Sequence, residues 1–301
     1  MDRVTFQLIY VRRVIVTLVN TIGPERAMGA ARWLAQGAFD LETPARKRAE
    51  LNLSRAYGNA LSSRERSELI RRVFENIAAF WVEVFLSRRK LRCSSWRRFV
   101  EFDDEPFLRS IAQSPRGAIL VTAYFGNFAV GAYALGQIFR PLYVVIDELR
   151  HPVLKSWQDE LCRQPNIRLL PRHRTRGRLA DLLRAGQKVL LIGEHVRLRG
   201  RAVEVNYLGR PCRCYPTVGV LARWCDVPVV AVAARREAGV FRFCVSSVMV
   251  ADPRGLDPQP NPVDTITARY IHGLEAIIRR WPEQYLWTRD WEPPQEAPSS
   301  S

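Results

Sequence analysis

Apolar residues recur at helical spacing through most of the first hundred positions. Three amphipathic stretches follow one another: PERAMGAARWLAQGAF, TPARKRAELNLSRAYG and SSRERSELIRRVFENIAAFWVEVFLS. A Thr-Pro start opens the second, and Ser62 or Ser63 is a plausible N-cap for the third. This pattern predicts an N-terminal helical region over residues 23–115.

From about residue 116 the pattern changes to short apolar runs separated by helical segments. The predicted strands are GAILVTAYF, PLYVVID, IRLLP, KVLLIGEH, VPVVAVAARRE and its hairpin partner VFRFCVSSVMV. The predicted helices between and after them are PVLKSWQDELCRQP, GRLADLLRAGQ, TVGVLARWCD and VDTITARYIHGLEAIIRRWPEQYL. Strands that alternate with helices indicate an α/β domain over residues 116–293, with a sheet covered on both faces. Residues 294–301 are predicted to be a disordered tail.

The first segment, VTFQLIYVRRVIVTLVNTIGP, is apolar but is interrupted by Arg12 and Arg13. A spanning helix needs roughly 20 mostly apolar residues, and a central arginine pair is costly inside a bilayer. We therefore predict that residues 1–22 form a helix in the membrane interface, with both arginines reaching headgroups. A core-facing helix of a soluble protein is the alternative, and the pattern does not decide whether residues 4–21 span the bilayer or lie on it.

Composition adds a strongly basic balance to this picture. The 301 residues carry a formal net charge of +16, and only four of the 46 basic residues are lysines. Arginine suits bidentate binding of phosphate, although an arginine-rich composition also accumulates in GC-rich genomes. The charge predicts an anionic partner: a phospholipid surface, an acidic carrier protein or nucleic acid. Nucleic acid is the weakest of the three, because the sequence contains neither a recognition helix nor a stacking-aromatic motif.

The six cysteines are irregularly spaced and include no C-x-x-C pair. Together with the lack of a signal-peptide cleavage site, this predicts reduced thiols in a cytosolic environment. Cys212, Cys214 and Cys225 form the only candidate metal cluster, but their spacing does not fit a typical ligand pattern. We predict neither a metal nor a cofactor.

Several motifs then occur in a familiar order. GAILVTAYFGNFAVGAYALG is followed by the YLGRP turn, the ARREAGVFRF strand pair and the ending PEQYLW. In these motifs, and from about Ile22 to Pro293, the chain resembles the bacterial lipid A biosynthesis acyltransferase family, the lauroyl and myristoyl transferases. The resemblance implies a three-layer αβα acyltransferase domain with a mixed, mostly parallel sheet, and an N-terminal helical region on the cytoplasmic face of the inner membrane. It also implies transfer of an acyl chain from a carrier-protein thioester or acyl-CoA to a hydroxyl of a glycolipid or phospholipid.

The family's catalytic dyad is missing from its expected place. The usual motif reads His-Phe-Gly-Asn-Trp-Glu, with a histidine as the base and an acid five residues later. Here Tyr124 stands at the position of the histidine and Ala129 at that of the acid, whereas Gly126 and Asn127 are retained. Tyrosine, with an ordinary pKa near 10, is a poor base at neutral pH, and alanine has no polar group. The turn therefore retains its backbone signature without the groups that would do the chemistry.

Four histidines could supply a replacement base. His195 follows Glu194 directly after a predicted strand, where the family usually has Asp-Gln near the acyl or acceptor cleft. Neighbours in an extended segment point to opposite sides, so these two do not form a dyad with each other. His195 facing the cleft is the first candidate base, and a polar residue at a strand end is the alternative. The other three, which we expect to be surface, phosphate-contacting or structural residues, are His151, His173 and His272.

Candidate anion-binding residues are better preserved. Gly209 and Arg210 in YLGRP, and Arg235 and Arg236 in ARRE, match family positions and are candidate contacts for phosphate or carrier phosphopantetheine. Salt bridges to Glu237 or Glu204 are the alternative. A further basic loop, either a headgroup site or a solvated surface, contains Arg168, Arg172, Arg174, Arg176 and Arg178.

Two functions remain open from the sequence. The first is a membrane-associated acyltransferase that uses a non-standard base. The second is a catalytically inactive relative that binds lipid or acyl-carrier protein as a partner or regulator. The missing dyad favours the second, and the retained turn and arginines fit either.

Overall fold

The structure is a computed structural model that describes residues 17, 21–41, 43–147, 155, 165–172, 175–194, 200–256 and 260–289. The described helices are α2 (Pro24–Asp40), α3 (Pro44–Tyr57), α4 (Ser63–Lys90), α5 (Glu105–Gln113), α6 (Phe128–Ile138), α8 (Arg176–Arg184), α9 (Thr217–Cys225) and α10 (Pro262–Arg280). The described strands are β1 (Val100–Phe102), β2 (Ala118–Thr122), β3 (Leu142–Ile146), β4 (Ile167–Pro171), β5 (Lys188–Ile192), β6 (Val203–Tyr207), β7 (Arg210–Cys214), β8 (Val229–Arg236) and β9 (Phe243–Ala251).

Seven strands form one mixed sheet in the order β1-β9-β8-β2-β5-β3-β4. All neighbours in this sheet are parallel except β8 and β9, which form the predicted antiparallel pair. Since β8, β2 and β5 are parallel neighbours, the segments that follow them emerge at one edge of the sheet. The Tyr124 turn, Glu194 and the arginine pair of β8 are brought together in this way.

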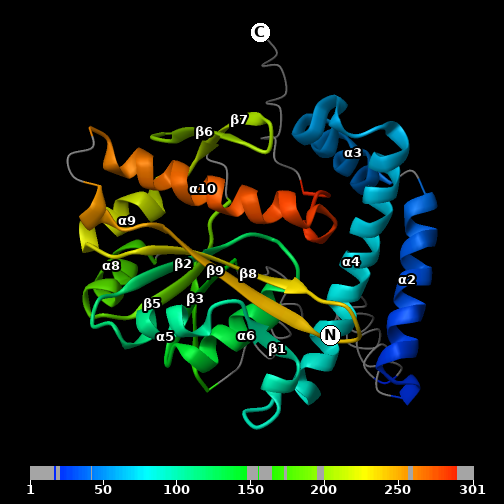
Figure 1. Cartoon of the computed structure of the whole chain (residues 1–301), viewed down its shortest axis with the longest axis horizontal. Helices are drawn as coiled ribbons and strands as arrows, with labels where there is room; N and C mark the ends of the chain where they lie inside the picture. Colours follow the sequence, from blue (N-terminus) through cyan, green and yellow to red (C-terminus); the bar gives the residue numbers. More distant parts are fainter. Residues whose placement is uncertain are drawn as a thin grey trace, which may run out of the picture.

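Helices cover both faces of the sheet, as Figure 1 shows. Along β2, Ile119 and Val121 pack in a core with α8, α9 and α10, whereas Ala118 and Leu120 pack in a second core with α5 and α6. All four side chains are fully buried. This alternation is the physical basis of the three-layer αβα fold, and it confirms the fold class predicted from the strand and helix pattern.

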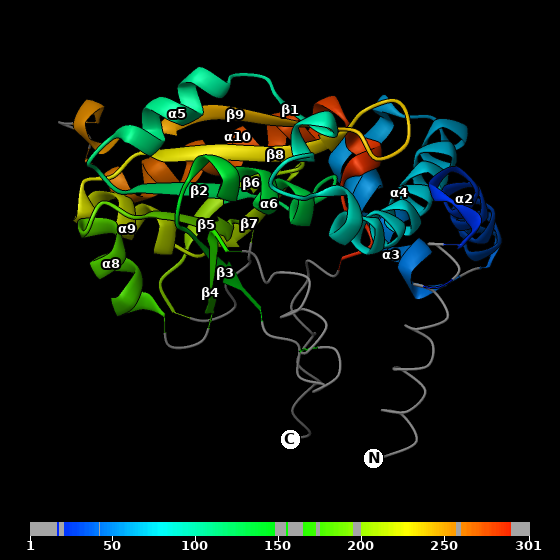
Figure 2. The same ribbon diagram turned by 90° about the horizontal axis from the view of Figure 1, so that it is seen from below.

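The helical region lies at one end of the sheet and is formed by α2, α3 and α4 (Figures 1 and 2). Ser62, one of the two predicted caps, begins α4: its hydroxyl accepts from the Glu65 N–H at 3.2 Å, and the Glu65 carboxylate accepts from the Ser62 N–H at 2.9 Å. The region expected to be helical over residues 23–115 also contains β1, which adds a strand to the edge of the sheet. The antiparallel β6–β7 hairpin, which surrounds the YLGRP turn, was also not predicted from the sequence.

Several predictions fall on residues outside the described part of the chain. They are nearly all of the interface helix at 1–22, nearly all of the helix at 152–165, and the tail at 294–301. None of the helices in the described ranges is long and apolar enough to cross a bilayer.

Candidate functional site

The turn between β2 and α6 has a backbone that only glycine fits well. Gly126 has a φ of 55°, and a Cβ added there would lie 1.9 Å from the carbonyl oxygen of Ala234 in β8. Asn127 then caps α6, because its side-chain oxygen accepts from the N–H of Val130 at 3.1 Å. Both retained residues of the motif therefore fix the path of the chain.

A buried ion pair anchors this turn to the helical region. The Asn127 amide donates to Oε2 of Glu83 in α4 at 2.9 Å, and Arg236 donates to the same carboxylate at 2.5 and 2.8 Å. The Glu83 side chain is fully buried, and that of Arg236 is only 12% exposed. The guanidinium of Arg236 also contacts Asn76. One of the arginines expected to bind phosphate is thus engaged in a structural ion pair.

The PEQYLW segment supports the turn from the other side. The Gly126 N–H donates to the carbonyl of Gln284 at 2.8 Å, and the Leu286 N–H donates to the carbonyl of Tyr124 at 3.0 Å. The Gln284 side chain binds both backbone groups of Arg236, at 2.6 and 2.9 Å. The PEQYLW segment, one of the motifs that carried the resemblance, therefore links the turn to the end of β8 through hydrogen bonds.

Glu194 is the polar centre of the site. Its carboxylate is fully buried and accepts from the Tyr124 N–H at 2.6 Å, from the Tyr207 hydroxyl at 3.0 Å and from Arg289 at 3.2 Å. The Tyr285 hydroxyl also donates to it. Burial, reinforced by the carboxylate, holds the pKa of Tyr207 and Tyr285 well above the ordinary value, so both remain donors.

Tyr124 lies in an aromatic and cationic setting. The Arg289 guanidinium stands 4.1 Å from the centre of its ring, and the ring meets Phe128 edge-on at 5.6 Å. Burial raises the pKa of Tyr124 above its ordinary value, so the phenol stays protonated at neutral pH and even less phenolate is present to accept a proton than in a free tyrosine. Ala129 is half-buried in the first turn of α6 and adds no polar group. Tyr124, Phe128 and Phe80 therefore form an aromatic surface at the position of the family's histidine, with Phe80 stacked on Phe128 at 5.0 Å.

The other predicted binding residues lie in two places. Arg235 pairs with Asp103 at 2.7 Å and with Glu237 at 2.5 Å, and this pairing holds the pKa of Asp103 well below its usual range. Glu237 is thus a salt-bridge partner, as the alternative interpretation proposed. Gly209 has a φ of 77° and packs against α3, where an added Cβ would lie 2.4 Å from the Arg55 carbonyl. Arg210 is half-buried at the start of β7, opposite Tyr207.

The candidate base His195 lies outside the described residues, as do His151, His173 and Arg174. His272 is exposed on α10. In the basic loop, Arg172 pairs with Asp147 at 3.2 Å, and Arg168 donates to the carbonyl of Pro165 at 3.0 Å. No group of three metal-binding side chains occurs within the described ranges.

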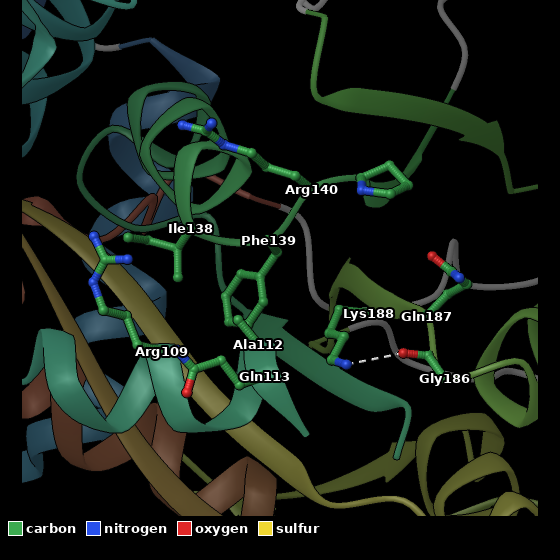
Figure 3. Close-up of a pocket in the computed structure, with 10 residues that line it drawn as sticks. Arg109, Ala112, Gln113, Ile138, Phe139, Arg140, Gly186, Gln187 and Lys188 are labelled. Atoms are coloured by element: carbon green, nitrogen blue, oxygen red, sulfur yellow. Dashed lines mark hydrogen bonds between the residues drawn. The ribbon is translucent and has the colours of Figure 1, made fainter. Parts of the chain in front are cut away.

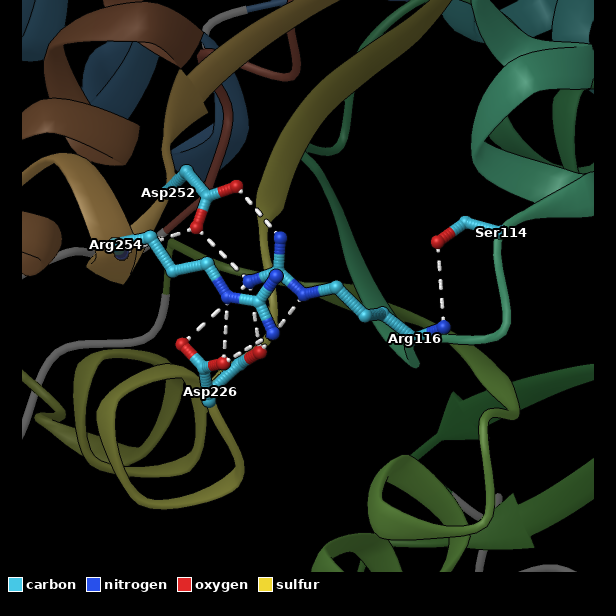
Figure 4. A network of polar contacts seen from close by, with 5 residues as sticks. All are labelled: Ser114, Arg116, Asp226, Asp252 and Arg254. Carbon is cyan, nitrogen blue, oxygen red and sulfur yellow. Dashed lines mark hydrogen bonds and ion pairs between the residues drawn. The ribbon is translucent and has the colours of Figure 1, made fainter.

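Two further features lie away from the turn. A hollow of about 370 Å³ opens at the opposite end of α6, between Arg109, Arg140 and Lys188 (Figure 3). At the same side of the sheet, Arg116 and Arg254 join Asp226 and Asp252 in a network that ties the start of β2 to the ends of α9 and β9 (Figure 4).

Comparison with known proteins places this architecture in a family. The family model described as bacterial lipid A biosynthesis acyltransferase matches residues 4–291. The chain belongs to this family. Membership supports a general acyltransferase function. The search of curated proteins found no match.

Among solved structures, the chain is similar to the 1-acyl-sn-glycerophosphate (LPA) acyltransferase PlsC from Thermotoga maritima. Sequence identity is 14%, and the alignment covers 77% of this chain and 88% of that chain, with a TM-score of 0.36. The fold assignment therefore depends on the sheet and helix layers described above.

Sequence reasoning did not single out several residues of the site. Among them are Glu83, Tyr207, Tyr285 and Arg289. Tyr207 and Tyr285 lie inside motifs recognised from sequence, so their spacing carried a signal. Glu83 and Arg289 stand in ordinary amphipathic or polar contexts, and only the fold brings them to the turn.

Proposed function

We propose that this protein acts at a membrane and transfers a fatty acyl chain from an acyl-carrier thioester to a hydroxyl of a glycolipid or phospholipid. The observation that carries the proposal is the frame of the β2–α6 turn. Gly126, Asn127 and the Glu83–Arg236 ion pair hold the turn in place, and none of these contacts uses the side chains of Tyr124 or Ala129. The scaffold for acyl transfer is therefore kept independently of the dyad.

The reaction needs one proton acceptor. The lipid hydroxyl oxygen attacks the thioester carbonyl carbon, a C–O bond forms, the C–S bond breaks, and the carrier thiol leaves with the proton lost by the hydroxyl. The turn supplies no base for this step, because burial keeps Tyr124 protonated. Glu194 is occupied by its four donors. His195, next to Glu194 in sequence, is the base that we propose.

A second candidate function is binding without turnover. It is favoured by one observation: the position of the family's histidine now belongs to an aromatic surface, with Tyr124 packed edge-on against Phe128 and covered by Arg289. In this case the protein holds a lipid or an acyl-carrier protein and serves as the partner or regulator of an active enzyme.

One experiment separates the two. Purified protein receives labelled acyl-carrier thioester and lipids from its own source, in detergent micelles. The natural protein is compared with His195→Ala and with the double variant Tyr124→His/Ala129→Glu. His272→Ala is the matched control for loss of a histidine, and Tyr124→His/Ala129→Gln is the control for a dyad without its acid.

The outcomes are distinct. Turnover by the natural protein that falls about 10²- to 10⁴-fold in His195→Ala, but not in His272→Ala, supports transfer with His195 as base. An inactive natural protein with an active double variant supports binding without turnover. If the natural protein turns over equally well without His195, the proposed base is wrong. If neither the natural protein nor the double variant is active in folded form, the proposed reaction is refuted.

A further inference from the structure

Helix α2 carries apolar residues on two opposite sides. Its inner side packs in a core with α4, through Ala27, Met28 and Ala31. We define the outer face of α2 as the stripe formed by Ala30, Trp33, Leu34, Gly37 and Leu41. The first four positions follow the spacing of one helical face and Leu41 comes directly after the last residue of the helix, so the stripe is about 16 Å long.

The outer face is exposed over its whole length. Trp33 is 73% exposed, Leu34 63% and Leu41 64%, the three largest values among the exposed large hydrophobic residues of the described chain. Figures 1 and 2 place α2 at the outside of the molecule, with α4 between it and the sheet. An apolar stripe of this kind, anchored by a tryptophan, is unusual on a surface that faces only water.

From this surface we infer that the outer face of α2 docks onto an anionic phospholipid bilayer. The inference rests on the proposed membrane location and names the surface that makes the contact. Tryptophan is suited to the boundary between headgroups and acyl chains, and leucine to the region just below it.

Charge and sequence continuity favour a bilayer as the occupant. Helix α2 packs along α4, and Phe39 at its end meets Phe74 in the first half of α4 with ring centres 6.3 Å apart, so α2 begins beside the end of α4 (Figure 1). Arginine side chains are exposed there, at positions 89 and 92. A basic end on an apolar stripe complements anionic headgroups. The apolar run of residues 4–21 also precedes α2 directly in sequence.

The test measures vesicle binding by the full-length protein. Vesicles of equal parts phosphatidylcholine and phosphatidylglycerol are sedimented with the natural protein and with Trp33→Gln/Leu34→Gln/Leu41→Gln. Glutamine is a good helix former, so the helix is retained. Val220→Gln/Trp224→Gln on α9 is the matched control, because Trp224 is 62% exposed and Val220 37%.

We expect the partition coefficient of the α2 variant to fall by about 30-fold or more, and that of the α9 control to change by less than about threefold. The natural protein should bind pure phosphatidylcholine vesicles more weakly than the anionic vesicles. Added salt should abolish this difference. Brominated lipids should quench part of the tryptophan fluorescence of the natural protein. This quenching should disappear in Trp33→Phe and remain in Trp224→Phe.

Three results would overturn the inference. The first is an α2 variant that binds vesicles as well as the natural protein, and the second is an α9 control that loses as much. The third is a natural protein that self-associates through this face, seen when the α2 variant becomes monomeric while vesicle binding is unchanged. Sedimentation needs no turnover and acyl transfer is measured in micelles, so an α2 variant that still binds vesicles overturns the docking surface and leaves the proposed acyl transfer standing.

Discussion

The buried contact between Glu83 and Arg236 should be the main anchor of the β2–α6 turn. It joins α4 of the helical region to the end of β8, and through Asn127 it reaches the start of α6. Replacing Glu83 by alanine removes the carboxylate that all these groups share. The guanidinium of Arg236 then remains in place with only Asn76 as a side-chain partner among the described contacts.

The cost follows from burial. The Glu83 side chain is fully buried and that of Arg236 is 12% exposed, so water cannot take the place of the lost partner. Removing one member of such a pair destabilises a protein by about 3–5 kcal/mol, because the remaining charge stays buried. We expect Glu83→Ala to lower the free energy of unfolding by about 4 kcal/mol. Glu83→Gln, which keeps the volume and one acceptor oxygen, should cost about 2 kcal/mol.

Urea unfolding monitored by tryptophan fluorescence measures both variants. Arg254→Gln is the control. The Arg254 side chain is 61% exposed and that of its partner Asp226 is 47% exposed, so loss of this ion pair should lower the free energy of unfolding by no more than about 1 kcal/mol. A Glu83→Ala variant as stable as the control would refute the reasoning, since it would mean that the turn is not anchored through this carboxylate.

Three further variants test the frame of the turn and one distant ion pair. Gly126→Ala should lower the free energy of unfolding by more than about 2 kcal/mol in thermal melts, because φ is 55° and the added Cβ would meet the Ala234 carbonyl at 1.9 Å; an unchanged melting temperature would contradict this. Asn127→Ala should cost about 2 kcal/mol in urea unfolding through loss of the helix cap, and a cost below about 0.5 kcal/mol would count against the cap. Arg116 holds the pKa of Asp252 below its ordinary 3.8, so the stability from this pair is complete above that value and is lost as the pH falls below it. The difference in unfolding free energy between the natural protein and Asp252→Asn should therefore be constant down to about pH 5 and shrink below about pH 4; a difference that grows in acid would reverse the sign of the argument.

The layers of the fold could be predicted because each strand has a clear pattern of its own. The runs at β2 and β8 are apolar on both sides and short, which is typical of strands covered on both faces. Two elements were missed. Strand β1 has only three residues, too few for any period to appear. The β6–β7 hairpin does show an alternating pattern, VEVNY with buried residues at every second position, and this signal was overlooked because the segment was interpreted only through its YLGRP motif.

The site was harder to predict than the fold because its contacts join residues far apart in the chain. Sequence reasoning found the turn and Glu194, since both follow apolar strands. It gave Arg235 and Arg236 as candidates for ligand binding with salt bridges as the alternative, and the structure gives both of them carboxylate partners. Nothing in the sequence around Glu83 or Asp103 shows that these acids form ion pairs, because Arg236 and Arg235 reach them only when α4 and β1 are placed against the end of β8.

The arrangement of these contacts explains how the turn can be kept while its chemistry changes. The Tyr124 side chain packs against Phe128 and Arg289, Ala129 has no polar group, and the turn is held by backbone groups, Gly126, Asn127 and the Glu194 carboxylate. Substitution at the two dyad positions therefore costs the fold little, whereas substitution of Glu83, Gly126 or Glu194 costs it much. It follows that Tyr124→His/Ala129→Glu should fold with nearly natural stability, and any activity or inactivity of that variant can be attributed to chemistry. An unfolded double variant would show instead that the aromatic surface has become part of the core.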